Sequence, residues 1–259
     1  MMNIVNAIKS SFGFFTIVPM NDQNFDKESI NLLWVPYLAA SIFAIMLYVL
    51  FSCFLNYYIS AILSFIGICL FLGLQNVDAL SDLGDGLMKR GSPEVRFKVM
   101  KDSANGSGGM FSFFSVYAIS LISLLSVNKS EFIPVILFGQ MDAVLWMVMI
   151  SYKSRTTESG YANYFSEVTG KRGFIILNLL PLILILFFLI PQFIIVFSIS
   201  ILMSIIFRFY ILGVFKKING DIIGASGEIG RMFSFIMVNI SAITSFPWIY
   251  HIYAFIPFH

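Results

Sequence analysis

Histidine, cysteine and charged residues are all scarce in this 259-residue chain, and each scarcity excludes a class of protein. The two histidines, His251 and His259, lie close to the C-terminus, and the two cysteines, Cys53 and Cys69, lie in apolar runs. We therefore expect neither a disulfide framework nor a thiolate metal site, and most His-based zinc or iron chemistry is excluded. Carboxylates remain as the metal ligands that the sequence offers.

Charged residues make up only 12% of the chain, whereas 58% of its residues are hydrophobic. A soluble domain is about 25% charged and about 45–50% apolar, so this composition predicts an integral membrane protein. The net charge of +2 is too small to indicate a nucleic-acid partner. Because no internal repeat or linker is visible, we expect residues 1–259 to form a single integral membrane domain.

Seven apolar stretches are each close to the length of about 20 residues that a membrane-spanning helix requires. They are residues 32–55, 57–74, 110–127, 132–150, 173–190, 191–212 and 232–258. The apolar part of residues 1–20 is too short to span and lacks a signal-peptide cleavage site, so it predicts a short interfacial helix. The predicted fold is an all-α polytopic bundle of about seven transmembrane helices.

The distribution of basic residues predicts the orientation, because cytoplasmic loops are enriched in Lys and Arg. With the N-terminus in the cytoplasm, 15 of the 16 Lys and Arg lie on the cytoplasmic side, and only Lys129 lies outside. The long polar loops share that side: residues 75–109, 151–172 and 213–231. The sequence therefore predicts a multi-pass protein of the cell membrane with its site at the cytoplasmic mouth. The role of Asp142, the main charge within a span, stays open.

Three carboxylates stand out in the first polar loop. Asp78, Asp82 and Asp85 fall at positions i, i+4 and i+7, which on a helix lie within a sector of about 60°. Like charges at that spacing repel one another, and a bound divalent cation removes the repulsion. Carboxylate oxygens are ligands that Mg²⁺ prefers, usually together with substrate phosphates. We expect these three side chains to bind Mg²⁺; the alternative is a solvated loop whose charges have no function.

The second half of the loop supplies further charged groups. Ser92 and Pro93 predict a helix start, and the helix is expected to end near Ser103. Folded back as a hairpin, this helix would aim Asp102 at the aspartates as a further ligand or base. Three cations would then neutralise phosphate oxygens: Lys89, Arg90 and Lys101.

The run NVDALSDLGDGL, followed at a distance by VMKDS, resembles the signature of the cobalamin synthase family, the membrane-bound adenosylcobinamide-GDP ribazoletransferases. The matching positions are Asp78, Asp82, Asp85, Gly86, Met100, Lys101, Asp102, Ser103 and Gly106. A segment with Arg155 and Glu158 resembles a second loop of the family, for which an ordinary connecting loop is the alternative. A glycine-rich run with Asp221, followed by Glu228, resembles a third, for which a turn capping a span is the alternative.

The resemblance implies an Mg²⁺-dependent transferase of cobalamin biosynthesis. The hydroxyl of α-ribazole, or of its 5′-phosphate, would attack the cobinamide-bound phosphate of adenosylcobinamide-GDP, releasing GMP and forming adenosylcobalamin. It implies catalytic roles for Asp82, Asp85 and Asp102. Substrate-binding roles are implied for Lys89, Arg90, Lys101, Arg155, Asp221 and Glu228.

Several family positions differ in this chain. Ile17 stands where the family has an arginine, Ala104 replaces another, and Met141-Asp142 replaces a Ser-Arg pair. The lost arginines favour one alternative, a non-catalytic protein that binds or transports corrinoids. A second alternative is a CDP-alcohol phosphatidyltransferase-like enzyme, although its D-G-x-x-A-R start is absent. The sequence does not indicate an oligomeric state.

Overall fold

A computed structural model describes residues 4–20, 30–102, 104, 106–157, 161–171 and 193–243. In these ranges every regular element is a helix, and one isolated bridge pairs Thr156 with Ile218. The elements are α1 (Ile4–Phe15), α3 (Trp34–Ser52), α4 (Tyr57–Phe71), α5 (Gln75–Met88), α6 (Pro93–Met100), α7 (Ser107–Leu125), η1 (Lys129–Glu131), α8 (Phe132–Ser151), α9 (Ala162–Thr169), α11 (Phe193–Phe215) and α12 (Gly220–Ile243). The predicted all-α fold class is confirmed.

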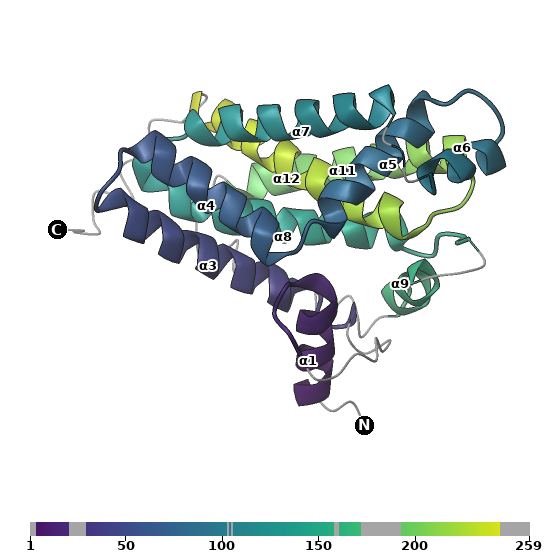
Figure 1. Ribbon diagram of the computed structural model, residues 1–259, viewed down its shortest axis with the longest axis horizontal. Helices are drawn as coiled ribbons and strands as arrows, with labels where there is room; N and C mark the ends of the chain where they lie inside the picture. The colour runs from purple at the N-terminus through teal and green to yellow at the C-terminus, as the bar shows by residue number, and fades with distance from the viewer. Residues whose placement is uncertain are drawn as a thin grey trace.

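The long helices run roughly along one axis of the molecule, with α1 lying across them (Figure 1). Helix α12 lies in the middle, where it packs against α5, α7, α8 and α11. Helix α8 is buried along nearly its whole length, as expected of a helix that is apolar on every side. The more peripheral helices leave large apolar side chains exposed, among them Met46, Phe114 and Phe209.

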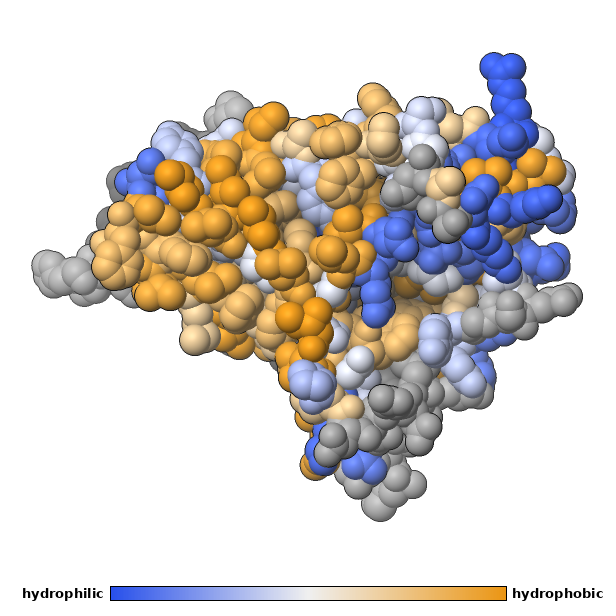
Figure 2. Space-filling view, in the orientation of Figure 1, coloured by the Kyte–Doolittle hydropathy of each residue, from blue (hydrophilic) through white to orange (hydrophobic). Residues whose placement is uncertain are grey.

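Apolar and polar surfaces are separated along the molecule. Figure 2 shows hydrophobic residues over α3, α4 and α7 and hydrophilic residues gathered at the end where α5 and α6 lie. The first surface suits contact with lipid and the second contact with water, because large exposed apolar patches mark membrane or protein contacts. The polar end therefore corresponds to the predicted mouth of the bundle.

Four helices are long and apolar enough to cross a membrane: Trp34–Ser52, Ser107–Leu125, Lys129–Ser151 and Ile195–Phe215. They coincide with the first, third, fourth and sixth predicted spans. Of the remaining predictions, residues 173–190 lie outside the described residues. Residues 232–243 form the second half of α12, and the rest of the last predicted span is also outside the described ranges.

The second predicted span, residues 57–74, corresponds to α4, a continuous helix of 15 residues that meets the length and hydropathy of a span only together with α5. Helix α4 ends at Phe71, and α5 leaves it at an angle of 86°. Gly73 lies at the break with φ of 69°, a backbone conformation that glycine adopts without steric cost. The bend separates an apolar helix from an acidic one, so the aspartates begin where the chain turns away from α4.

The prediction of a polar loop over residues 213–231 is wrong for residues 220–231, which form the buried first half of α12. Three glycines account for the difference. A Cβ on Gly224 would lie 3.1 Å from the Cβ of Ala79, and one on Gly230 would lie 2.5 Å from Trp146. A Cβ on Gly227 would lie 3.2 Å from Met147. Small residues let membrane helices approach closely, so these glycines serve helix packing rather than the alternative of a turn that caps a span.

Candidate active site

The acidic run Gln75–Met88 forms a helix, α5, as its spacing predicted. Asp78 is exposed, whereas Asp82 and Asp85 are partly buried against neighbouring helices. Helix α5 lies outside the four apolar spans, at the polar end of the bundle. Burial, followed by the negative charges of Asp221, Asp78 and Asp85, raises the pKa of Asp82 to about 7. The carboxylates are therefore close enough together to disfavour the ionised form of Asp82.

Asp85 holds the loop that leads into α7. One of its carboxylate oxygens accepts a hydrogen bond of 2.7 Å from the Gly106 backbone N–H, and the other accepts one of 2.8 Å from Gly109. Gly106 is the N-cap residue of α7, so the carboxylate also lies at the positive end of that helix. The arrangement fixes the entrance of α7 against the acidic helix.

Asp221 joins the aspartates from the first turn of α12. Asn219 orients it: the Asn219 side-chain oxygen accepts from the Ile222 N–H at 3.0 Å, and its amide nitrogen donates to Asp221 at 2.7 Å. Asp221 was predicted to bind substrate from a loop. The structure instead places it at a capped helix start, within electrostatic reach of Asp82.

Asp102 is exposed, and its side chain accepts a hydrogen bond of 3.3 Å from the Ala104 N–H. The predicted helix before it is present as α6, which ends at Met100. The carboxylates that act on Asp82 are Asp221, Asp78 and Asp85. Asp221, which the sequence assigned only to substrate binding, is therefore a further member of the cluster.

The predicted phosphate-binding cations differ in position. Lys101 lies close enough to Asp221 for the two charges to interact. Lys89 and Arg90 follow α5 and are exposed at the polar end. Arg155 is also exposed, and its backbone oxygen accepts a 2.8 Å hydrogen bond from Ile218, which ties two polar connections together.

Glu228 lies inside the bundle and not at its mouth, with only 3% of its surface exposed. It accepts hydrogen bonds from both terminal nitrogens of Arg231, at 2.8 and 3.0 Å, and from the Tyr117 hydroxyl at 2.8 Å. These bonds use most of its acceptor sites, and Glu228 is not among the residues that line the pocket described below. The matched loop residue Glu158 lies outside the described residues.

A pocket of about 470 Å³ adjoins the acidic cluster. It lies between α1, α5, α9 and the start of α12. Four aromatic residues form part of its lining: Phe14, Phe15, Tyr161 and Phe165. Its polar residues are Gln75, Asn76 and Asp221. Asp221 therefore belongs to both the pocket and the cluster around Asp82.

Among the residues that the structure describes, no three His, Cys, Asp or Glu side chains converge closely enough to hold a metal ion by themselves. Asp82 nevertheless interacts with Asp78 and Asp221 from two different helices. Mg²⁺ usually takes one or two protein carboxylates and completes its coordination with water and substrate phosphates. The oxygen-only donor set fits a cation shared with a phosphate substrate.

Some residues of the site had no sequence signal. Arg96 donates to the Gly86 and Leu87 carbonyls at 2.9 Å each and so caps the end of α5. The sequence assigned it no role. Asn219 was detectable in principle, because an Asn just before a helix is a common N-cap.

A helical membrane protein with a carboxylate-lined pocket at its polar end is consistent with an enzyme acting on a phosphorylated substrate at the membrane surface. The sequence pattern of the cobalamin-5-phosphate synthase family matches residues 7–239. The chain therefore belongs to this family, and it is a transferase of cobalamin biosynthesis. The predicted family membership is confirmed.

Curated relatives agree with this assignment. The chain is 30% identical to the adenosylcobinamide-GDP ribazoletransferase of Thermoplasma volcanium over 92% of both chains. It is also 30% identical to the enzyme of the same name from Picrophilus torridus, over 92% of this chain and 98% of the relative. The Pyrococcus furiosus enzyme is 28% identical over 91% of this chain and all of its own length. No solved structure matches the chain.

Proposed function

We propose that this protein transfers adenosylcobinamide phosphate from adenosylcobinamide-GDP to α-ribazole or its 5′-phosphate. The observation that supports this proposal is that Asp221, which lines the pocket, interacts with Asp78 and Asp82 on α5. A hydroxyl held in the pocket is thereby placed next to carboxylates that can anchor a diphosphate through a cation.

In the proposed step, the acceptor hydroxyl oxygen forms a bond to the cobinamide-bound phosphorus. The bond from that phosphorus to the GMP oxygen breaks, and GMP leaves with its electron pair. The hydroxyl proton passes to a carboxylate of the cluster. Since positioning and charge neutralisation supply most of the rate in such displacements, a rigid pocket beside charged groups is the main requirement.

We assign Asp82, together with either Asp78 or Asp221, to a Mg²⁺ ion shared with the diphosphate. The ion would neutralise the charge that develops on the phosphate oxygens. Asp85 keeps the α7 entrance in place through Gly106 and Gly109. The exposed cations at this end, Lys89, Arg90 and Lys101, are assigned to phosphate oxygens.

Activity is expected to require Mg²⁺ or Mn²⁺ and to be insensitive to zinc-selective chelators, because the site offers oxygen ligands. The measurement is GMP release by the purified protein in lipid, with adenosylcobinamide-GDP and α-ribazole, across a titration of each cation. Full activity in EDTA, or loss of activity with a zinc-selective chelator alone, contradicts the metal assignment.

We also propose that the polar end faces the cytoplasm. Both Ser92, at the start of α6, and Ser130, in η1, are exposed. In a background with Cys53 and Cys69 changed to Ala, Ser92→Cys is expected to react with a membrane-impermeant maleimide only in inside-out vesicles. Ser130→Cys is the matched control and should show the opposite pattern. Labelling of Ser92→Cys from outside intact cells refutes the orientation.

A further inference from the structure

We infer that the 470 Å³ pocket is the acceptor site: it binds the nucleoside α-ribazole, with the base against the aromatic residues and the ribose toward Asn76 and Asp221. This inference rests on the proposed function and specifies which of its two substrates the pocket takes. The donor would then lie outside the pocket, with its diphosphate at the aspartates.

The size of the pocket separates the two substrates. Its volume of about 470 Å³ is within the range of about 300–1,000 Å³ that is usual for small-molecule sites. A nucleoside has room in such a space, whereas a corrin ring with its side chains and nucleotide does not. Of the two substrates, only the acceptor can therefore enter as a whole.

The aromatic lining suits the base of α-ribazole. The rings of Phe14 and Tyr161 meet edge to face with centroids 4.7 Å apart, and those of Phe15 and Phe165 do so at 6.1 Å. A methylated benzimidazole is flat and carries no polar substituent, so it gains from contact with such rings. Guanine, the base of the donor, carries several hydrogen-bonding groups that this aromatic lining does not pair.

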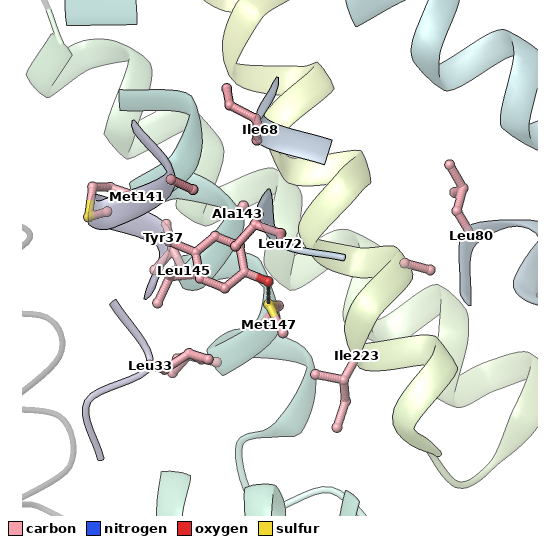
Figure 3. Packing of buried hydrophobic residues seen from close by; sticks show 14 of the residues in the cluster. Leu33, Tyr37, Ile68, Leu72, Leu80, Met141, Ala143, Leu145, Met147 and Ile223 are labelled. Atoms are coloured by element: carbon pink, nitrogen blue, oxygen red, sulfur yellow. Dashed lines mark hydrogen bonds between the residues drawn. The ribbon is translucent and has the colours of Figure 1, made fainter. Parts of the chain in front are cut away.

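A polar chain fixes the other part of the pocket. The Asn76 side-chain nitrogen donates to the Tyr37 hydroxyl at 2.9 Å, and that hydroxyl donates to the Met147 sulfur at 3.1 Å. Figure 3 shows Tyr37 packed in the core with its hydroxyl directed at Met147. Because its N–H is held in this way, Asn76 presents its amide oxygen as an acceptor for a hydroxyl.

Gly224 keeps that oxygen accessible. A Cβ at this position would lie only 2.9 Å from the Asn76 amide oxygen, so any side chain here would crowd the acceptor. Asp221 lies one helical turn earlier on α12 and also lines the pocket. The two acceptors match ribose hydroxyls.

Tyr161→Ala is the first test, since Tyr161 is 49% exposed and its truncation leaves the bundle core intact. Binding of α-ribazole to the purified protein in lipid nanodiscs, measured by equilibrium dialysis without donor, is expected to weaken roughly tenfold, as when one aromatic contact to a base is lost. Tyr164→Ala, three residues further along in α9 and outside the pocket lining, is the matched control and should bind as the wild type does. Phe14→Ala is the second test variant, with the same expected loss.

Steady-state kinetics give an independent readout. The KM for α-ribazole is expected to rise in Tyr161→Ala and Phe14→Ala, while the KM for adenosylcobinamide-GDP stays unchanged. A rise in the donor KM alone overturns the acceptor assignment and leaves the transferase activity standing. Wild-type protein that fails to bind α-ribazole, or that binds guanosine at the same site equally well, also overturns it. Absence of GMP release despite pocket-dependent α-ribazole binding refutes the proposed function and supports the pocket assignment.

Discussion

Asp82→Asn is expected to reduce GMP release by about 100-fold or more, while the protein remains folded and inserted. The amide has nearly the same shape as the carboxylate but lacks the charge that a divalent cation requires. Loss of a cation that stabilises transferring phosphate costs several kcal/mol of transition-state stabilisation, and each 1.36 kcal/mol is about tenfold in rate. Asp82 is the residue on which burial and the other three aspartates act, so it is the centre of the cluster.

The measurement is the rate of GMP release at increasing Mg²⁺ concentration, together with thermal unfolding of the same sample. Glu131→Gln, which removes a carboxylate from η1 outside the pocket and the acidic cluster, is the matched control and should leave the rate unchanged. Near-normal release by Asp82→Asn at saturating Mg²⁺ would show that this carboxylate does not bind the cation.

Asp85→Asn distinguishes the metal site from the loop that supports it. The mutant is also expected to lose turnover, but for a structural reason: the new amide N–H₂ would face a backbone N–H of Gly106 or Gly109. Its midpoint of thermal unfolding should therefore fall, whereas that of Asp82→Asn should not. Equal stability of the two mutants would argue against the separate roles.

Local signals in the sequence were sufficient to predict much of the polar end. The spacing of Asp78, Asp82 and Asp85 predicted a helix, and Ser92-Pro93 predicted the start of α6. Such signals depend on neighbours three or four residues apart, which the sequence displays directly. The apolar runs likewise predicted four helices long enough to span, because hydropathy is a property of each segment by itself.

The rest depends on residues distant in the chain. The glycines of 220–231 are typical of a turn, and only the proximity of Ala79, Met147 and Trp146 makes them helix-packing residues. The pocket joins α1 to α9 and α12, and no local pattern relates Phe14 to Tyr161. The role of Asp85 likewise could not be predicted from neighbouring residues. Its spacing matched that of the other aspartates, but its partners are backbone N–H groups 21 and 24 residues away.

Glu228→Gln is expected to destabilise the protein strongly. Glu228 and Arg231 are both almost completely buried, and the carboxylate accepts hydrogen bonds from the two terminal guanidinium nitrogens. Removing one partner of a buried pair typically costs about 3–5 kcal/mol, because the other charge stays buried without compensation. The Nε of Arg231 already has no hydrogen-bond partner within the described part of the protein, so the loss of the carboxylate adds to an existing deficit.

The double variant Glu228→Gln/Arg231→Met tests the cause. With both charges removed, the uncompensated guanidinium is gone, so the double variant should be more stable than Glu228→Gln alone. The midpoint of thermal unfolding is measured for the wild type and both variants in the same lipid or detergent. Ser226→Ala, on the same helix, is the control and shows how much a neutral change at a buried position shifts that midpoint.

If Glu228→Gln unfolds at the wild-type temperature, the pair does not stabilise the bundle, and substrate binding by Glu228 becomes the better explanation of its charge. If the double variant is less stable than the single one, Glu228 and Arg231 act through packing rather than through their charges. The stabilising role of the pair requires both a large loss in the single variant and a recovery in the double one.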